Sequence, residues 1–215
     1  MSYLNHYAEL LDDLRKLGNL RQFKANIQQG RNIQIGDHSM LNLSSNDYLG
    51  IASDLQFREA FFDLTANSER RMASSSSRLL TGNFPEYEQL EQHLSQAFLG
   101  RSALLFNSGY HMNIGILPAL CDSRTLILAD KLIHASMIDG IRLSSAKYLR
   151  YRHNDLAHLQ QMLETYADDE AYDRIIVVTE SIFSMDGDVA NIDKLIDLGI
   201  TSFKIEGRMK GKEYV

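Results

Sequence analysis

Hydrophobic residues recur along the chain with two periods, one typical of helices and the other of strands. In the first hundred residues, leucine, tyrosine and phenylalanine return every three or four positions, and Gly18 and Pro85 suit a helix end and a helix start. Residues 33–43 instead alternate apolar and polar around Gly-Asp-His, which predicts a β-hairpin. The pattern predicts helices over residues 3–17, 54–68 and 86–98.

From residue 100 onward, short apolar runs alternate with helical stretches. We predict strands over 102–106, 125–129, 147–151 and 174–179, and helices over 111–120, 135–143 and 155–167. Strands separated by helices of this length are typical of βαβ units, in which helices cover both faces of a parallel sheet. The predicted fold class is therefore α/β with a mostly parallel sheet, preceded by an N-terminal helix and a β-hairpin.

Polar and titratable residues follow each predicted strand. Ligands of open parallel sheets bind beyond the carboxyl ends of the strands, so these residues are candidates for a common site. They are Asn107 to Tyr110, Asp130 with His134, His153 to Asp155, and Glu180 with Ser184.

Residues Ser108, Gly109 and Tyr110 stand where the first predicted strand is expected to turn into a helix. One interpretation is a tight turn that uses the conformational freedom of glycine. The other is an anion site, because a helix N-terminus offers unpaired N–H groups and the positive end of a dipole. Neither G-x-x-x-x-G-K-S/T nor G-x-G-x-x-G occurs, so the pattern alone leaves both interpretations open.

The other candidate residues also have structural explanations. His134 suits a helix cap as well as a catalytic role, and His153 suits a loop in which Asn154 or Asp155 caps the next helix. The serine-rich segment 74–83 suits either a solvated loop or close approach to a ligand or partner subunit. Histidine spacing and a single cysteine argue against a metal site, and the lack of G-x-S-x-G argues against a serine hydrolase.

Composition narrows the class of protein. Of the 215 residues, 44% are hydrophobic and 23% are charged, as in ordinary globular proteins. A net charge of −6 without a basic block argues against nucleic acid or an anionic membrane as a partner. No apolar run approaches the ~20 residues of a membrane span, and the lone Cys121 excludes an internal disulfide. We expect a soluble cytoplasmic protein.

Six longer motifs together resemble a known family. They are LNLSSNDYLG at 41–50, SSSSRLLTGNFPEYEQLE at 74–91, ALLFNSGYHMN at 103–113, DKLIHASMIDGI at 130–141, RHND at 152–155 and VVTESIFSMDGD at 177–188. In order and spacing they resemble the α-oxoamine synthases, pyridoxal-phosphate enzymes of the aspartate-aminotransferase fold (fold type I). SSNDYLG with SRLLTGN resembles the 8-amino-7-oxononanoate synthase branch in particular. The aminolevulinate, aminoketobutyrate and sphingoid-base synthase branches are the alternatives, together with a non-catalytic fragment.

The resemblance implies pyridoxal 5′-phosphate as the cofactor and suggests residues that hold it. The Ser108–Tyr110 segment would bind the cofactor, with backbone groups of Gly109 and Tyr110 near its phosphate. His134 would stack on the pyridine ring as the catalytic histidine, Ser184 would hydrogen-bond the cofactor, and Glu180 would support it. In such enzymes the cofactor is the electron sink, while the protein supplies orientation and electrostatics.

The resemblance also implies substrates and a partner. Arg21 matches the family's substrate-contacting arginine, Asn46 lies in a loop that approaches the substrate, and His134 would contact the substrate as well. The implied reaction is the decarboxylative condensation of L-alanine with pimeloyl-CoA or a pimeloyl carrier protein, a step of biotin biosynthesis. Active sites of the family form at a homodimer interface, toward which the SRLLTGN region at 77–83 would reach.

The C-terminal part departs from the family. The family's Asp-x-x-His motif and its Schiff-base lysine segment are not found, so we expect this chain alone to bind the cofactor reversibly and to be inactive. The end, GITSFKIEGRMKGKEYV, resembles a segment of the collagenase-like peptidases, which favours a fusion over a chance βα-like segment. We therefore predict an N-terminal helix and hairpin segment over 1–50, an incomplete cofactor-binding large domain over 51–190, and a foreign tail over 191–215.

Overall fold

The computed structural model describes residues 2–64, 73–183 and 187–200. The chain divides into two compact units, residues 1–73 and 74–215. The segment boundaries expected at residues 50 and 190 stay predictions, and residues 201–215 of the expected tail lie outside the described residues. Within the described part of the chain, no helix has the length and apolar character needed to cross a membrane.

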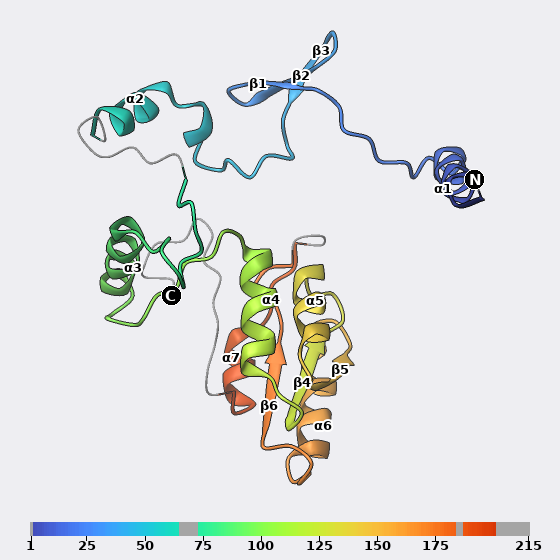
Figure 1. Ribbon diagram of the computed structural model, residues 1–215. Coiled ribbons are helices and arrows are strands. Elements are labelled where there is room, and N and C mark those ends of the chain that lie inside the picture. The colour runs from blue at the N-terminus through green and yellow to red at the C-terminus, as the bar shows by residue number, and fades with distance from the viewer. Residues whose placement is uncertain (1, 65–72, 184–186, 201–215) are drawn as a thin grey trace. The chain divides into compact units, whose positions relative to one another are not determined.

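In its described residues the first unit contains the α-helices α1 and α2, a short 3-10 helix (Ile51–Ser53) and a small antiparallel sheet (Figure 1). The N-terminal helix is confirmed, and Gly18 follows its end with a positive φ of 69°. The expected hairpin is also confirmed, as the second and third strands of the sheet. The elements are α1 (Ser2–Lys16), β1 (Ile27–Gln29), β2 (Asn32–Ile35), β3 (His38–Leu41) and α2 (Leu55–Leu64).

One feature of this unit, strand β1, differs from the sequence pattern. Strand β1 contains only one strongly apolar residue, Ile27, and it forms because Gly30 takes a positive φ of 57° in the turn that brings β1 against β2. The helix predicted over 54–68 is described as α2 up to Leu64, and residues 65–68 lie outside the described residues.

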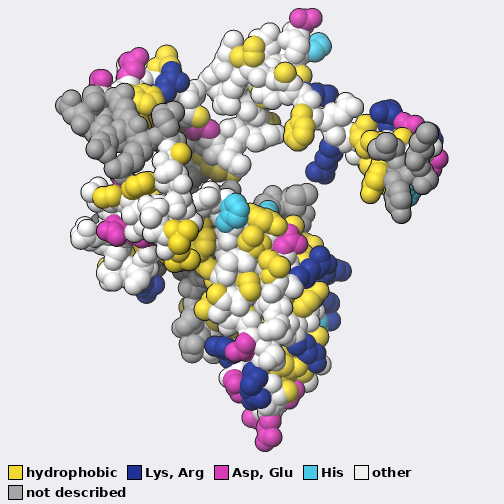
Figure 2. All heavy atoms as spheres, in the orientation of Figure 1, with side chains coloured by type: hydrophobic (Ala, Val, Ile, Leu, Met, Phe, Trp, Pro, Cys, Tyr) yellow, Lys and Arg dark blue, Asp and Glu magenta, His cyan; other side chains and the backbone are white. Residues whose placement is uncertain are grey.

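Many large hydrophobic side chains of the first unit are exposed; yellow side chains reach the molecular surface in Figure 2. On α1 they form the stripe that predicted the helix, and α2 carries three exposed phenylalanines. The residues are Tyr7, Leu10, Leu11, Leu14, Phe57, Phe61 and Phe62. The periodic pattern thus identifies these helices without identifying what their apolar faces contact.

The second unit is built on a parallel sheet with strand order β5-β4-β6. Both outer strands pair with β4 in parallel register, so that Leu128 lies opposite Leu149 on one side and Val177 on the other. The parallel sheet expected from the βα alternation is therefore confirmed. The strands are β4 (Thr125–Asp130), β5 (Lys147–Tyr151) and β6 (Arg174–Val178).

Helices cover both faces of this sheet (Figure 1). Helices α4 and α5 contribute to the core on one face, and α6 and α7 contribute to the core on the other. The helices expected over 86–98, 111–120, 135–143 and 155–167 are confirmed, and α7 is an additional short helix. Their bounds are α3 (Pro85–Ala97), α4 (Gly109–Leu120), α5 (Ala135–Leu143), α6 (Leu156–Tyr166) and α7 (Ile192–Asp197).

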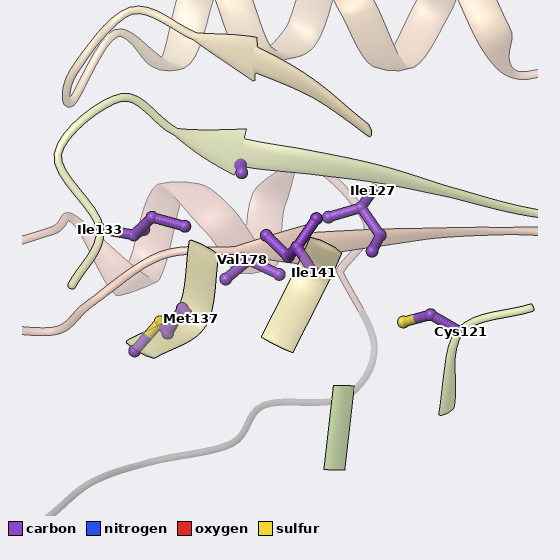
Figure 3. Packing of buried hydrophobic residues seen from close by; sticks show 7 residues of the cluster. Cys121, Ile127, Ile133, Met137, Ile141 and Val178 are labelled. Atoms are coloured by element: carbon purple, nitrogen blue, oxygen red, sulfur yellow. The ribbon is translucent and has the colours of Figure 1, made fainter. Parts of the chain in front are cut away.

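Strand β4 is the centre of the core, and all six of its residues are buried. Successive side chains of a strand point to opposite faces, so Ile127 and Ala129 belong to one apolar cluster and Leu126 and Leu128 to the other. Figure 3 shows the first cluster, in which Ile141 of α5 lies beside Ile127. The continuous apolar run of β4 is what a strand covered on both faces requires.

The strand predicted over 102–106 is wrong, because this segment forms no strand in the structure. A strand exists only through pairing, and none of the described strands pairs with these residues. The backbone N–H of Leu105 donates instead to the Glu91 carboxylate of α3, at 2.9 Å. Residues 102–106 therefore have the local sequence of a strand, but no described strand lies beside them to pair with.

The serine-rich loop over residues 74–83 is anchored to α3 by a two-pronged ion pair. The two Nη atoms of Arg78 donate to the carboxylate oxygens of Glu91 at 2.8 and 2.9 Å, and Arg78 Nε donates to Asn83 Oδ1 at 2.8 Å. The hydrogen bonds from Arg78, together with that from the Leu105 N–H, lower the pKa of Glu91 to about 2. This loop has a defined conformation of its own, which the solvated-loop interpretation did not require.

Candidate functional site

Polar groups from two βα connections meet beyond the carboxyl ends of β4 and β6. Asp130 is the last residue of β4, His134 caps α5, and Glu180 follows β6 by two residues. The backbone N–H of His134 donates to Glu180 Oε1, which joins the connection after β4 to the one after β6. The expectation that strand ends bring these residues together holds for this pair.

The start of α4 has the features of an anion site. Ser108 caps the helix, and its Oγ accepts a hydrogen bond from the His111 N–H at 3.2 Å. Gly109 is the first helical residue and has no positive φ, so the turn interpretation, which relied on the conformational freedom of glycine, is not needed. A Cβ at this position would meet no atom within 4 Å, and the N–H groups of a first helical turn lack acceptors within the helix. An anion can therefore approach the backbone of Gly109 and Tyr110.

Tyr110 connects the first turn of α4 to α5. Its hydroxyl donates to Asp139 Oδ2 at 3.2 Å, and about half of its side chain is exposed. The negative charge of Asp139, followed by the hydrogen bond that its carboxylate accepts, raises the pKa of Tyr110 above its ordinary value. The phenol of Tyr110 therefore ties the first turn of α4 to α5 by donating to Asp139.

His134 is both an exposed aromatic residue and a helix cap. Its Nδ1 accepts a hydrogen bond from the backbone N–H of Ser136 at 3.2 Å, and it lies 2.7 Å from Ser136 Oγ. Ser136 is buried, and its Oγ accepts a hydrogen bond from Asn113 Nδ2 of α4 at 2.9 Å. The structural role considered for His134 is thus confirmed, and the same contacts fix its ring at the edge of the sheet.

A second cluster lies beside the first, around His153. Its Nδ1 is 2.8 Å from Oδ1 of the buried Asp130, and its Nε2 is 2.6 Å from Asp188 Oδ2. The Asn154 N–H and side-chain amide donate to the same two carboxylates, at 2.9 and 2.7 Å. The ring also lies edge-on to buried Phe183, with 4.5 Å between ring centroids. His153 therefore ties the connection after β6 to the end of β4.

The two carboxylates around His153 make folding depend on pH. The hydrogen bond to Asp130, together with that to Asp188, raises the pKa of His153 above its ordinary value, and the hydrogen bond from His153 lowers the pKa of Asp188. A raised histidine pKa stabilises the fold fully below about pH 6.5, and this contribution disappears as pH rises through the raised pKa. A lowered carboxylate pKa contributes above about pH 4, and this contribution disappears as pH falls through the lowered pKa.

We therefore expect His153→Gln to cost most stability between about pH 4 and 6.5 and less as the pH rises beyond the raised pKa of His153. The measurement is urea unfolding of both proteins, followed by circular dichroism, across this range and up to pH 9. His6→Gln on α1, an exposed residue, is the matched control and should give little difference at any pH. A stability loss in His153→Gln that is equal at all pH values would contradict this expectation.

The remaining expected site residues lie elsewhere or outside the described chain. Ser184 lies outside the described residues. Arg21 and Asn46 belong to the first unit, where both are exposed and Asn46 Oδ1 accepts a hydrogen bond from the Tyr48 hydroxyl at 3.3 Å. Their roles toward a substrate stay predictions, as do the cofactor roles of Ser108, Gly109, Tyr110, His134 and Glu180.

Sequence reasoning missed three residues that organise this edge. Asn113 and Ser136 hold His134, and Asp188 completes the bridge through His153. A partial signal existed for Ser136, since it stands two positions after a candidate cap, where a backbone N–H seeks an acceptor. The helix cap considered at Asp155 is confirmed, because its Oδ1 accepts from the His158 N–H at 2.9 Å.

A family model and curated relatives both match most of this chain. The sequence model for aminotransferase class I and II matches residues 38–201. The 8-amino-7-oxononanoate synthase of Haemophilus ducreyi is 53% identical over 198 residues, which cover 91% of this chain and 51% of that protein. The chain spans about half the length of the curated relatives it matches.

Solved structures agree on the fold. Serine palmitoyltransferase from S. paucimobilis with bound PLP–myriocin aldimine superposes with a TM-score of 0.77 at 23% identity, over 93% of this chain and 52% of that one. The crystal structure of 8-amino-7-oxononanoate synthase from Francisella tularensis gives a TM-score of 0.55 at 31% identity, over 72% of this chain and 41% of that one. These likenesses confirm the α/β class of fold type I, of which the chain holds about half.

Proposed function

The chain belongs to the aminotransferase class I and II family of pyridoxal-phosphate enzymes, among the α-oxoamine synthases, and we propose that it carries the N-terminal half of an 8-amino-7-oxononanoate synthase. The observation that supports the particular branch is the 53% identity to the Haemophilus ducreyi synthase over 198 residues. The proposed activity is the condensation of L-alanine with a pimeloyl thioester in biotin biosynthesis. A cytoplasmic homodimer is part of the same proposal.

The residues at the sheet edge fit pyridoxal 5′-phosphate. A phosphate needs N–H donors without a competing side chain, and Gly109 at the start of α4 leaves the space beside the backbone open. A planar heteroaromatic ring needs a flat partner, and His134 is exposed with its ring held by Ser136. The donors, the open backbone and the aromatic side chain therefore suit the two ends of this cofactor.

In the proposed enzyme each group at the edge has one task. The N–H groups of Gly109 and Tyr110 would bind the phosphate, and the phenol of Tyr110, whose O–H donates to Asp139, would tie this first turn of α4 to α5. His134 would cover one face of the ring and exclude water from it, while Glu180 accepts the His134 backbone N–H and so holds that residue in place. When bound, the cofactor supplies an electron sink for the bond that breaks at the substrate's α-carbon.

Another α-oxoamine synthase activity is the second candidate. It stays open because membership of the family does not fix which amino acid and acyl thioester are condensed, and the TM-score of 0.77 to a serine palmitoyltransferase at 23% identity shows the shared fold alone. The two candidates differ in the amino acid and the acyl thioester that are condensed. They share the cofactor and the edge of the sheet described above.

Complementation separates these candidates. Residues 1–190 fused to the C-terminal half of the Haemophilus ducreyi synthase should restore growth without biotin to an auxotroph that lacks this enzyme. The 215-residue chain alone should not, because it spans about half of its relatives. The same fusion carrying His134→Ala should fail or grow far more slowly, and His93→Ala on α3 is the matched control that should grow normally.

The outcomes assign the function. Growth of the fusion supports the proposed synthase. No growth, combined with condensation of glycine or serine with another acyl-CoA by the purified fusion, would replace it with the second candidate. Growth supported by the 215-residue chain alone would refute the proposal that this chain is inactive without the other half. A monomer in light scattering of the active fusion would contradict the proposed homodimer.

A further inference from the structure

Hydrogen-bond donors converge on one nitrogen of the His134 ring. Nδ1 accepts from the Ser136 backbone N–H at 3.2 Å and lies 2.7 Å from Ser136 Oγ. A backbone N–H can only donate, so Nδ1 must present its lone pair. In the neutral imidazole the proton then resides on Nε2, for which the described residues provide no partner.

The Ser136 hydroxyl also contacts a residue of another helix. Asn113 Nδ2 of α4 donates to Ser136 Oγ at 2.9 Å, so this oxygen is already an acceptor toward α4. Because the Ser136 backbone N–H already requires an unprotonated Nδ1, the 2.7 Å contact between Nδ1 and Ser136 Oγ makes the hydroxyl the donor. Both donors demand the same tautomer of the ring.

Burial makes this arrangement stiff. Ser136 is only 1% exposed, so water does not compete for its hydroxyl, and Asn113 is half-buried. The backbone of His134 is fixed separately, because its N–H donates to Glu180. His134 itself is exposed, which leaves the Nε2 side of the ring accessible to a ligand.

We propose that Ser136 and Asn113 are positioning residues that hold His134 as the Nε2–H tautomer and fix the plane of its ring. The ring then offers one donor, Nε2–H, to an oxygen acceptor at the sheet edge, and its face lies ready for a flat heteroaromatic ligand. The tautomer follows from this chain's own contacts, whereas the benefit to a ligand rests on the proposed function.

The tautomer is measured by NMR of the 215-residue chain labelled with ¹⁵N-histidine, without any ligand. His134→Gln identifies the signal of His134 by its loss. His158 is an internal reference, since its Nδ1 also accepts a backbone N–H, that of Arg152 at 3.0 Å. We expect His134 and His158 to show the same Nε2–H pattern in the wild-type chain.

Two variants test the positioning residues. Ser136→Ala removes the hydroxyl donor, and Asn113→Asp keeps the shape but replaces the amide donor with a carboxylate that draws the hydroxyl hydrogen away from His134. Each should shift the tautomer ratio of His134 by roughly two- to tenfold, the equilibrium equivalent of one neutral hydrogen bond. Ser144→Ala at the other end of α5 is the matched control and should leave the ratio unchanged, as should the His158 signal in every variant.

Binding is measured separately with pyridoxamine 5′-phosphate, which has the ring and phosphate of the cofactor but no aldehyde to react with lysines. The dissociation constant should rise roughly two- to tenfold in both variants and stay constant in Ser144→Ala. An Nδ1–H tautomer in the wild-type chain, or an unchanged ratio in both variants, overturns the inference. A shifted tautomer with unchanged binding in these variants and in His134→Ala overturns the ligand role of His134, while the assignment of the tautomer stands.

Discussion

Replacing Gly140 with alanine is expected to lower the free energy of unfolding by roughly 1–3 kcal/mol, the usual cost of overpacking. In most helices this change is stabilising, by about 0.5–1 kcal/mol. Gly140 of α5 lies where α4 crosses, and a Cβ there would sit 2.4 Å from the Asn113 carbonyl oxygen and 3.0 Å from Leu117 Cδ1. Because one of these atoms belongs to a helix backbone, the two helices must separate. The cost of this separation should exceed the gain in helix propensity that alanine brings, so the net effect is a loss of stability.

Gly115→Ala is the matched control. Gly115 lies inside α4, and its added Cβ would meet only Phe106 Cε1, at the ordinary contact distance of 3.5 Å. This variant should be unchanged or more stable by about 0.5–1 kcal/mol. Urea unfolding followed by circular dichroism measures both proteins. Equal effects of the two substitutions would show that the crossing at Gly140 is not close-packed.

A second large loss is expected for Leu128→Ala, roughly 2–5 kcal/mol. Leu128 is fully buried in the middle of β4, between Leu149 of β5 and Val177 of β6, and it belongs to the apolar cluster under α6 and α7. Truncation removes apolar contacts and leaves a cavity that strands held on both sides cannot close. The same unfolding measurement gives the difference.

Leu143→Ala provides the comparison at constant chemistry. Leu143 is the last residue of α5 and is 63% exposed, so its truncation should change stability by less than about 0.5 kcal/mol. If both leucines cost the same, β4 is not the centre of the core. A loss at Leu128 with little change at Leu143 would support the two-sided burial of β4 and the parallel pairing that creates it.

At the edge of the sheet, the sequence predicted some residues of the candidate site and could not predict others. The sequence placed Asp130, His134 and Glu180 after strands, and parallel strands bring such positions together wherever the sheet forms. It could not indicate Asn113 as a partner of Ser136, because the two residues are 23 positions apart and on different helices. The bridge from Asp130 through His153 to Asp188 has the same origin, since it joins residues from three separate connections.

The sequence by itself determined the elements whose signal is local. The apolar run of β4, the helical periodicity of α3 to α6 and the cap considered at Asp155 depend on neighbours within a few positions, where side-chain pattern and backbone hydrogen bonding agree. The longer motifs added the family, and with it the fold class and the candidate cofactor residues.

Only the tertiary structure decided whatever depends on a distant partner. Residues 102–106 have the composition of a strand, yet the Leu105 N–H is bound to Glu91, and none of the described strands pairs with the segment. From the sequence alone, Gly140 is a helical glycine that would be expected to lower helix stability, and only the structure shows that α4 packs directly against it. Strand pairing and close packing are set by atoms that meet only through the fold, so their energies cannot be read from the order of residues along the chain.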